Sequence, residues 1–204
     1  MKPLVLAAVA AVALTGPAHA SIIPILGSVT ADGSNFKFNY TGRLEGTEGV
    51  KAGNQLVIVD FAGYVPGSVF STLADVSAST SASLPAGLLL APGASDNAAI
   101  PDLVFTYTGA DFHTTGGPYP GWTDFSGIGA LSTIGTVQAG SYSSVTVKNF
   151  PQLEGSPVFT EGQVDVPGIG AVPEPATWAM MLLGFAGLGG LLRRRARSAP
   201  MIAA

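Results

Sequence analysis

The sequence contains no cysteine and two histidines, His19 and His113. The lack of cysteine excludes a disulfide-stapled scaffold, thiolate metal sites and a cysteine nucleophile. His19 lies in a leader-like N-terminal segment, which leaves His113 as the one imidazole of the remaining chain. A lone histidine in a Gly- and Pro-rich stretch is more typical of a solvated loop than of a general base or a metal ligand.

Positive charge is scarce away from the chain ends. Residues 21–172 hold four basic side chains against twelve acidic ones, which gives a net formal charge of −8. The whole-chain value of −4 conceals this acidity, because the remaining basic residues lie at the two ends. Since nucleic acids are bound mostly through Lys and Arg, we do not expect a nucleic-acid partner.

Familiar catalytic and cofactor-binding motifs are also missing. The sequence has no Gly-x-Ser-x-Gly elbow, no His-Glu-x-x-His, no P-loop and no Rossmann glycine pattern. Two oxygen-rich segments, Asp32-Gly33-Ser34-Asn35 and Asp96-Asn97, match neither an EF-hand nor a calcium-binding repeat, and turn chemistry explains both. We therefore predict no catalytic residue, no metal site and no cofactor. A secreted hydrolase that uses a carboxylate pair remains an alternative, because the sequence does not select such a pair.

The N-terminus has the three parts of a secretory signal peptide. Lys2 supplies positive charge, residues 4–14 form an apolar run, and Ala18-His19-Ala20 is a small-x-small cleavage site. The run is short for a membrane span, which needs about 20 residues, so an uncleaved anchor is the less favoured alternative. The sequence predicts export through the Sec machinery and cleavage by signal peptidase between Ala20 and Ser21.

The C-terminal segment combines a stiff tripeptide, an apolar stretch and a basic end. Pro173-Glu174-Pro175 resists helix formation, because proline lacks an N–H donor and restricts the residue before it. Residues 176–192 carry no charge. As a helix they would span about 26 Å, a marginal length for a hydrocarbon core of roughly 30 Å. Trp178 lies where an interfacial aromatic belongs. A basic cluster would hold the far end in the cytoplasm; it consists of Arg193, Arg194, Arg195 and Arg197.

This segment resembles the PEP-CTERM sorting signal of Gram-negative bacteria, in its Pro-Glu-Pro-x-x-Trp-Ala variant. The matching residues are the tripeptide, Trp178 and Ala179, then the apolar run and the arginines. The resemblance implies that an exosortase, a membrane-embedded cysteine transpeptidase, cuts near the tripeptide. It further implies a transient anchor in the inner membrane and delivery to the cell surface or extracellular matrix, in species that make exopolysaccharide and biofilm. A plain single-pass anchor is the alternative.

The sequence between these ends predicts a β-rich body. Apolar and polar side chains alternate in residues 35–44, which is typical of a half-buried strand. Residues 55–61 are a continuous apolar run, typical of a central strand that is covered on both faces. Residues 75–83 are predicted as an edge strand or linker, and residues 84–99 as a long loop. The remaining predictions are a short lead-in at 21–33 and strands at 103–108, 125–133, 136–139, 141–149 and 162–166.

Short strands joined by turns, without alternating helices, favour a single all-β domain with an antiparallel sandwich or jelly-roll-like fold. The predicted organisation has five parts. They are a signal peptide at 1–20, a β-rich domain at 21–167, a spacer at 168–172, a sorting signal at 173–199 with a transmembrane helix at 176–192, and a disordered end at 200–204.

The loop 112–124 is the candidate ligand site of the body. It places Tyr119 and Trp122 among glycines and prolines. Exposed aromatic rings stack on sugars or anchor protein contacts, whereas the competing interpretation packs Trp122 into the core. Our first hypothesis is a non-enzymatic exported protein of the surface or matrix, linked to exopolysaccharide. A carbohydrate-binding module that uses this loop is the alternative.

Overall fold

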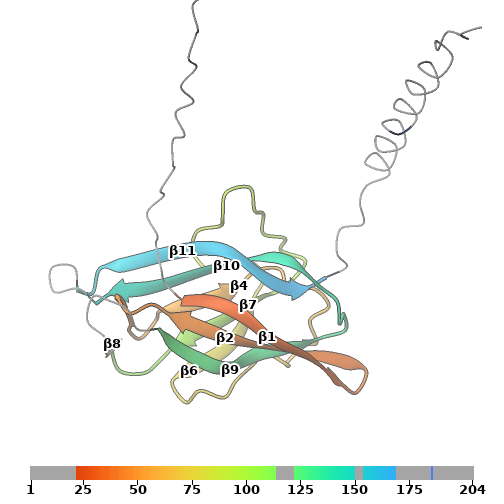
Figure 1. Cartoon of the computed structure of the whole chain (residues 1–204), viewed down its shortest axis with the longest axis horizontal. Helices are drawn as coiled ribbons and strands as arrows, with labels where there is room; N and C mark the ends of the chain where they lie inside the picture. The colour runs from red at the N-terminus through yellow and green to blue at the C-terminus, as the bar shows by residue number, and fades with distance from the viewer. Residues whose placement is uncertain (1–21, 114–121, 150–153, 169–184, 186–204) are drawn as a thin grey trace, which may run out of the picture.

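Eleven β-strands form the body in the part of the chain that the computed structural model describes, residues 22–113, 122–149, 154–168 and 185. In chain order they are β1 (Ile22–Asp32), β2 (Asn35–Leu44), β3 (Glu48–Val50), β4 (Gln55–Ile58), β5 (Phe70–Ser71), β6 (Val76–Ser81), β7 (Asp102–Tyr107), β8 (Phe112–His113), β9 (Thr123–Ser132), β10 (Val137–Lys148) and β11 (Pro157–Pro167). They form two antiparallel sheets that face each other as a sandwich (Figure 1). The all-β prediction is confirmed.

The smaller sheet has four strands in the order β1-β2-β9-β5. A two-residue turn joins β1 to β2 and leaves Asp32 opposite Asn35. Gly33 in this turn has a φ of 61°, a left-handed conformation that glycine adopts without steric penalty. The turn chemistry predicted for this Asp-Gly-Ser-Asn segment is confirmed.

The larger sheet has seven strands and is organised around β10. Its order is β6-β7-β4-β10-β3-β8, and β11 pairs with the other edge of β10. The β10–β11 pairing runs from Val137 opposite Pro167 to Val147 opposite Pro157. The opposite edge of β10 pairs first with β4 and then with β3. The twelve residues of β10 therefore hold three other strands in register.

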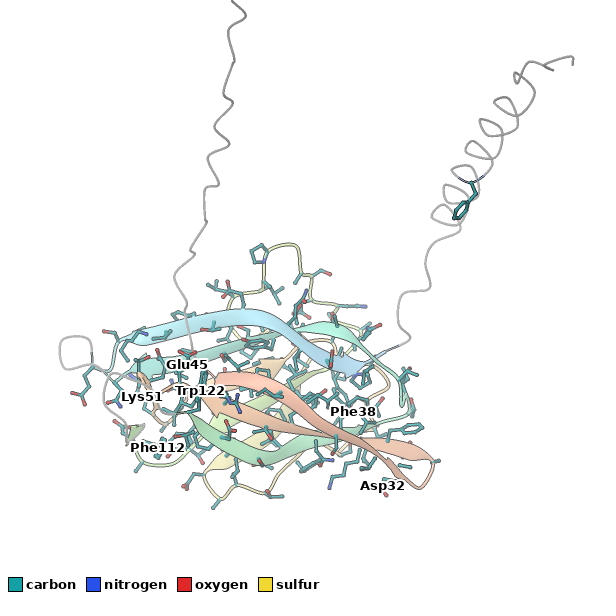
Figure 2. All side chains as sticks on the ribbon, viewed as in Figure 1. Asp32, Phe38, Glu45, Lys51, Phe112 and Trp122 are labelled. Atoms are coloured by element: carbon teal, nitrogen blue, oxygen red, sulfur yellow. The ribbon has the colours of Figure 1, made fainter. Side chains whose placement is uncertain are left out.

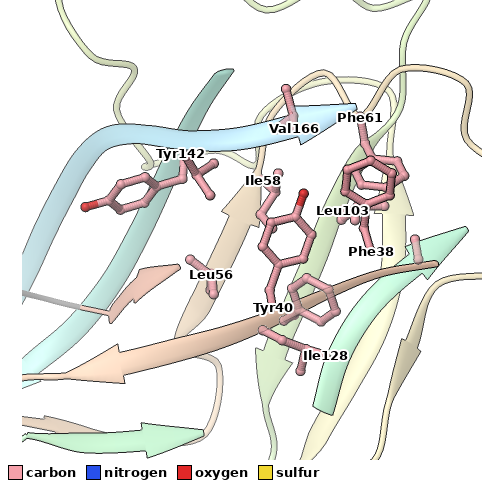
Figure 3. Packing of buried hydrophobic residues seen from close by; sticks show 12 residues of the cluster. Phe38, Tyr40, Leu56, Ile58, Phe61, Leu103, Ile128, Tyr142 and Val166 are labelled. Atoms are coloured by element: carbon pink, nitrogen blue, oxygen red, sulfur yellow. The ribbon is translucent and has the colours of Figure 1, made fainter. Parts of the chain in front are cut away.

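The main core lies between the two sheets (Figure 3). Phe38 and Tyr40 of β2 face Leu56 and Ile58 of β4, and all four are buried. Phe61, in the segment after β4, packs edge-on against Phe38 with ring centroids 5.5 Å apart. Burial of each such side chain stabilises the fold by about 1.5–3 kcal/mol. The Tyr40 hydroxyl also donates a hydrogen bond of 2.9 Å to the Asp165 carbonyl of β11, which links the two sheets.

A second, smaller cluster covers the outer face of the larger sheet. Val57 and Val59 alternate with the inward-facing residues of β4 and pack with Val104 of β7. Leu84 and Leu88 cover them, together with Leu90. These leucines belong to residues 82–101, the covering loop, which connects β6 to β7 and is drawn yellow-green in Figure 1. The prediction that the 55–61 run is covered on both faces is confirmed.

Most predicted strands are present, and one boundary prediction is exact. The strand predicted at 35–44 is β2, and β6 is an edge strand within 75–83. The long loop predicted at 84–99 contains no strand.

Two predictions about strand extent are wrong. Residues 22–32 form β1, although we expected a lead-in without a strand. Most positions of β1 are exposed or half-buried, so its sequence lacks the alternation that marks a strand. The segments 136–139 and 141–149 belong to one strand, β10, because Gly140 continues it. A Cβ atom at Gly140 would lie 2.5 Å from the Val166 side chain, so this glycine permits close packing and does not mark a turn.

Candidate functional site

The predicted processing residues lie outside the described part of the chain. They are Ala18, Ala20 and Ser21 near the N-terminus and Pro173, Glu174, Pro175, Trp178, Ala179, Arg193, Arg194, Arg195 and Arg197 near the C-terminus. Among the described residues, no helix combines the length and the apolar character that crossing a membrane requires. The strands of the body begin at Ile22 and end at Pro167, so they lie between the two predicted processing segments.

Hydrogen bonds fasten both ends of the described body. The Ile22 carbonyl accepts a bond of 2.9 Å from the Ser144 hydroxyl of β10. The Gly168 N–H donates to the Thr136 carbonyl at 3.0 Å, and the Thr136 hydroxyl donates to the Gly168 carbonyl at 2.7 Å. Five residue steps beyond Gly168, chain geometry limits the reach to Pro173 to roughly 17 Å.

Trp122 lies on the surface (Figure 2). Its side chain is 57% exposed, so the interpretation in which it packs into the core is wrong. The Arg43 guanidinium lies 5.3 Å from the centroid of the Trp122 ring. The same guanidinium donates two hydrogen bonds to Asp124, of 2.8 and 2.9 Å. These bonds raise the pKa of Arg43 and lower the pKa of Asp124. Tyr119 lies outside the described residues.

An apolar cavity of about 270 Å³ lies where strands of both sheets converge. Its lining includes Leu56, Phe105, Phe112 and Phe125, and the last two rings pack edge-on with centroids 6.0 Å apart. Asp75 is the one carboxylate among the lining residues. Glycoside hydrolysis needs two carboxylates flanking the substrate, so this cavity does not support the hydrolase alternative.

Three aspartates from distant parts of the sequence meet beside the covering loop. Asp60 follows β4, Asp96 lies in the covering loop, and Asp102 is the first residue of β7. Each offers a carboxylate oxygen within 4.8 Å of the others. We name these three residues the aspartate cluster.

Backbone N–H groups hold one oxygen of each carboxylate in the aspartate cluster. The Asp60 N–H donates to Asp102 Oδ1 at 2.9 Å, and the Asn97 N–H donates to Asp60 Oδ1 at 3.0 Å. The Leu84 N–H donates to Asp96 Oδ2 at 2.7 Å. Asp60 has a φ of 55°, a left-handed conformation that Asp tolerates better than most residues. Burial raises the pKa of Asp102 to about 6, although the bond from Asp60 acts in the opposite direction.

Glu48 of β3 is a second fully buried carboxylate, and it has a cationic partner. Lys148 Nζ lies 2.5 Å from Glu48 Oε1, and the Thr146 hydroxyl donates to Oε2 at 3.0 Å. Burial raises the pKa of Glu48, while Lys148 and Thr146 act in the opposite direction. Because both partners belong to β10, this network joins β3 to β10.

Comparison with protein-family models assigns residues 171–196 to the PEP-CTERM protein-sorting motif. The chain carries a PEP-CTERM sorting motif. This motif is the signature of an exosortase substrate, so the protein is exported, processed by exosortase and sorted to the membrane or surface. The matched span includes the Pro-Glu-Pro tripeptide, Trp178 and Ala179. No curated protein and no solved structure matches the chain significantly.

The aspartate cluster was not predicted from the sequence. We interpreted Asp96 as a turn residue, and no sequence pattern connects it with Asp60 or Asp102. A weak signal existed, because Asp60 stands directly after an apolar pair and Asp102 directly before the apolar run of β7. A charged residue in such a position is easily assigned to a loop, and only the pairing of β4 with β7 shows that the two residues are neighbours.

Proposed function

We propose that the β-rich body serves outside the cell as a non-catalytic component of the cell surface or extracellular matrix, associated with exopolysaccharide and biofilm. The PEP-CTERM motif at residues 171–196 carries this proposal, because it directs the body to that location. The arrangement of the strands supports it. They lie between Ile22 and Pro167, so cleavage at either predicted processing segment would leave every described strand pair intact.

Mass spectrometry of the surface-associated protein tests the processing step. We expect peptides from the body and no peptide from residues 178–204 on the mature protein. Replacement of Pro173, Glu174 and Pro175 by alanine should retain the full-length chain in the membrane fraction, as should removal of the host's exosortase. Pro200→Ala, a proline outside the motif, is the matched control and should be processed normally. Normal release of the triple variant would refute the role of the tripeptide.

Carbohydrate binding through Trp122 is the second candidate function. The exposed ring favours it, together with the charged Arg43 and Asp124 beside that ring. Aromatic rings bind the apolar faces of sugars, and neighbouring charged groups can donate or accept hydrogen bonds at the sugar hydroxyls.

Retention of the purified protein on exopolysaccharide from the host tests this second function. Trp122→Ala should abolish retention while the melting temperature stays nearly unchanged. Phe159→Ala is the matched control, since Phe159 is an aromatic residue of β11 that is 38% exposed. Retention of Trp122→Ala at the wild-type level would remove this candidate and leave the first proposal untouched.

A further inference from the structure

We propose that Asp60, Asp96 and Asp102 form a binding site for one Ca²⁺ ion, which fastens the covering loop to the larger sheet. This site goes beyond the proposed function and does not depend on it. It also differs from the sequence-based prediction, which expected no metal site.

The spacing of the carboxylate oxygens fits a calcium ion. One oxygen from each aspartate lies within 4.8 Å of the other two. Calcium binds oxygen at about 2.3–2.6 Å, so two oxygens on one ion lie at most about 5.2 Å apart. The three aspartates would therefore supply three ligands, and water or carbonyl oxygens would complete the six to eight that calcium takes.

Two buried oxygens in the aspartate cluster have no hydrogen-bond partner, and this is the observation that indicates a ligand. Asp102 is 0% exposed, and its Oδ2 atom is buried and unpartnered. Oδ1 of Asp96 is likewise buried and unpartnered. The second oxygen of each carboxylate is held by a backbone N–H, so both side chains are fixed with one oxygen left over. An unpaired buried carboxylate is strongly unfavourable, and a bound cation would remove that penalty.

The described residues provide no positive charge for the aspartate cluster. The two salt bridges among them engage Arg43 with Asp124 and Lys148 with Glu48. Neither involves Asp60, Asp96 or Asp102. Neither of these ion pairs of the described residues therefore compensates the aspartate cluster, which is consistent with a cation bound from solution.

The chemistry of the ligands favours calcium over other metals. All three side chains are carboxylates, hard oxygen ligands that suit Ca²⁺ or Mg²⁺ and not the soft transition metals. Magnesium demands a near-ideal octahedron at about 2.0–2.1 Å, whereas calcium accepts irregular geometry. Asp60 follows a strand, Asp96 lies in a loop and Asp102 begins a strand, so the three ligands come from unrelated backbone positions. Calcium accepts such a ligand set more readily than magnesium does.

The position of the site indicates what the ion would do. Asp96 belongs to the covering loop, Asp60 follows β4, and Asp102 is the first residue of β7. Leu84 and Leu88 of the same loop cover Val57 and Val59 on the outer face of the sheet. A calcium ion would therefore hold this apolar cover in place after export.

Calorimetric titration and thermal melting of the full chain in mild detergent, stripped with EDTA, test the proposal with CaCl₂ as the probe. We expect one Ca²⁺ per chain, with a dissociation constant of about 0.1–1 mM, as in extracellular modules. At about 5 mM CaCl₂ the melting temperature should rise by about 5 °C. MgCl₂ at the same concentration should produce a smaller shift.

Three variants locate the effect. Asp96→Asn and Asp102→Asn should each weaken calcium binding at least about tenfold and reduce the shift in melting temperature by about half or more, because one anionic ligand is lost. Asp32→Asn is the matched control, since Asp32 is an exposed aspartate of the other oxygen-rich turn, and it should behave as wild type. If Asp102→Asn does not fold, Asp96→Asn and calcium protection of the covering loop from proteolysis carry the test. The proposal would be overturned if CaCl₂ gave the wild type neither a heat of binding nor a rise in melting temperature. It would also be overturned if the two cluster variants bound calcium as the wild type does.

Discussion

Glu48 and Asp102 are both fully buried carboxylates, but their surroundings differ. Glu48 has a lysine from its own chain, with Lys148 Nζ at 2.5 Å, and both of its oxygens have hydrogen-bond donors. Asp102 has one backbone donor, one oxygen without a partner, and two aspartates as its nearest ionisable neighbours. The fold thus provides a lysine for the buried carboxylate of Glu48 and leaves one buried oxygen of Asp102 without a hydrogen-bond partner. The same burial penalty thus yields a structural ion pair at β3 and a candidate metal site at β7.

Of the variants considered, Lys148→Met should cause the largest loss in the free energy of unfolding. It leaves the buried Glu48 charge without its cation, which should lower the free energy of unfolding by about 3 kcal/mol. Urea denaturation measures this loss. Addition of Glu48→Gln to the same chain should restore much of the stability, because the uncompensated charge disappears. Lys37→Met is the control, at a lysine whose ammonium lies 4.5 Å from the centroid of the Phe70 ring, and it should cost about 1 kcal/mol or less. Equal losses in the two lysine variants would show that Glu48 does not depend on its partner.

When calcium is absent, Asp102→Asn should stabilise the protein, whereas Lys148→Met should destabilise it. In EDTA, the variant removes one of three like charges while Oδ1 still accepts the bond from the Asp60 N–H. We expect the free energy of unfolding to rise by about 1 kcal/mol, because a neutral buried group replaces an uncompensated charge. Urea denaturation in EDTA measures this gain. A clear loss of stability would mean that the carboxylate already has a compensating partner.

The pH dependence of stability tests whether burial or Lys148 has the larger effect on the pKa of Glu48. Burial raises the pKa of Glu48 above its ordinary value of 4.5, so the folded state holds that proton more tightly than the unfolded chain. The resulting stability is present below the unfolded pKa and is lost as the pH rises through the folded pKa. The wild type should therefore lose stability relative to Glu48→Gln as the pH rises above 4.5, the ordinary pKa of glutamate. A difference that moves the other way would show that Lys148 outweighs burial.

Arg43 and Asp124 provide the exposed counterpart of these buried groups, with the smallest expected effect. Their side chains are 38% and 43% exposed, so solvent screens the pair. Asp124→Asn should change the free energy of unfolding by about 0.5 kcal/mol or less at moderate salt. Chemical denaturation at low and high salt measures this change. A loss as large as that of Lys148→Met would contradict the role that burial plays in the comparison.

Local sequence patterns predicted the strands whose side chains carry a strong signal. The alternation in residues 35–44 reflects a strand with one buried face, and the run at 55–61 reflects a strand with two. Local sequence patterns did not predict β1, and they did not predict that β10 is one continuous strand. Much of β1 is exposed, so its sequence shows no regular alternation, although it pairs with β2 along its length. Gly140 resembles a turn residue in the sequence, and only the structure shows the Val166 side chain packed against it.

The candidate sites divide in the same way. The sorting motif was found from sequence because a membrane enzyme reads it as a linear segment. The exposure of Trp122 was left open by the sequence, and the structure shows this residue 57% exposed, with Arg43 beside its ring. The aspartate cluster could not be predicted, because Asp60 and Asp102 are 42 positions apart in the chain and meet through the pairing of Ile58 with Leu103.

The sorting motif and the β-rich character of the body were both predictable from the sequence, because they depend on contiguous residues. These are a Pro-Glu-Pro tripeptide before an apolar run and the period-two alternation of a half-buried strand. The tertiary structure alone decided which buried charges are compensated, because the electrostatic energy of a carboxylate depends on the groups within a few ångströms of it. For Glu48 that neighbour is a lysine 100 positions away, and for Asp102 it is two more aspartates.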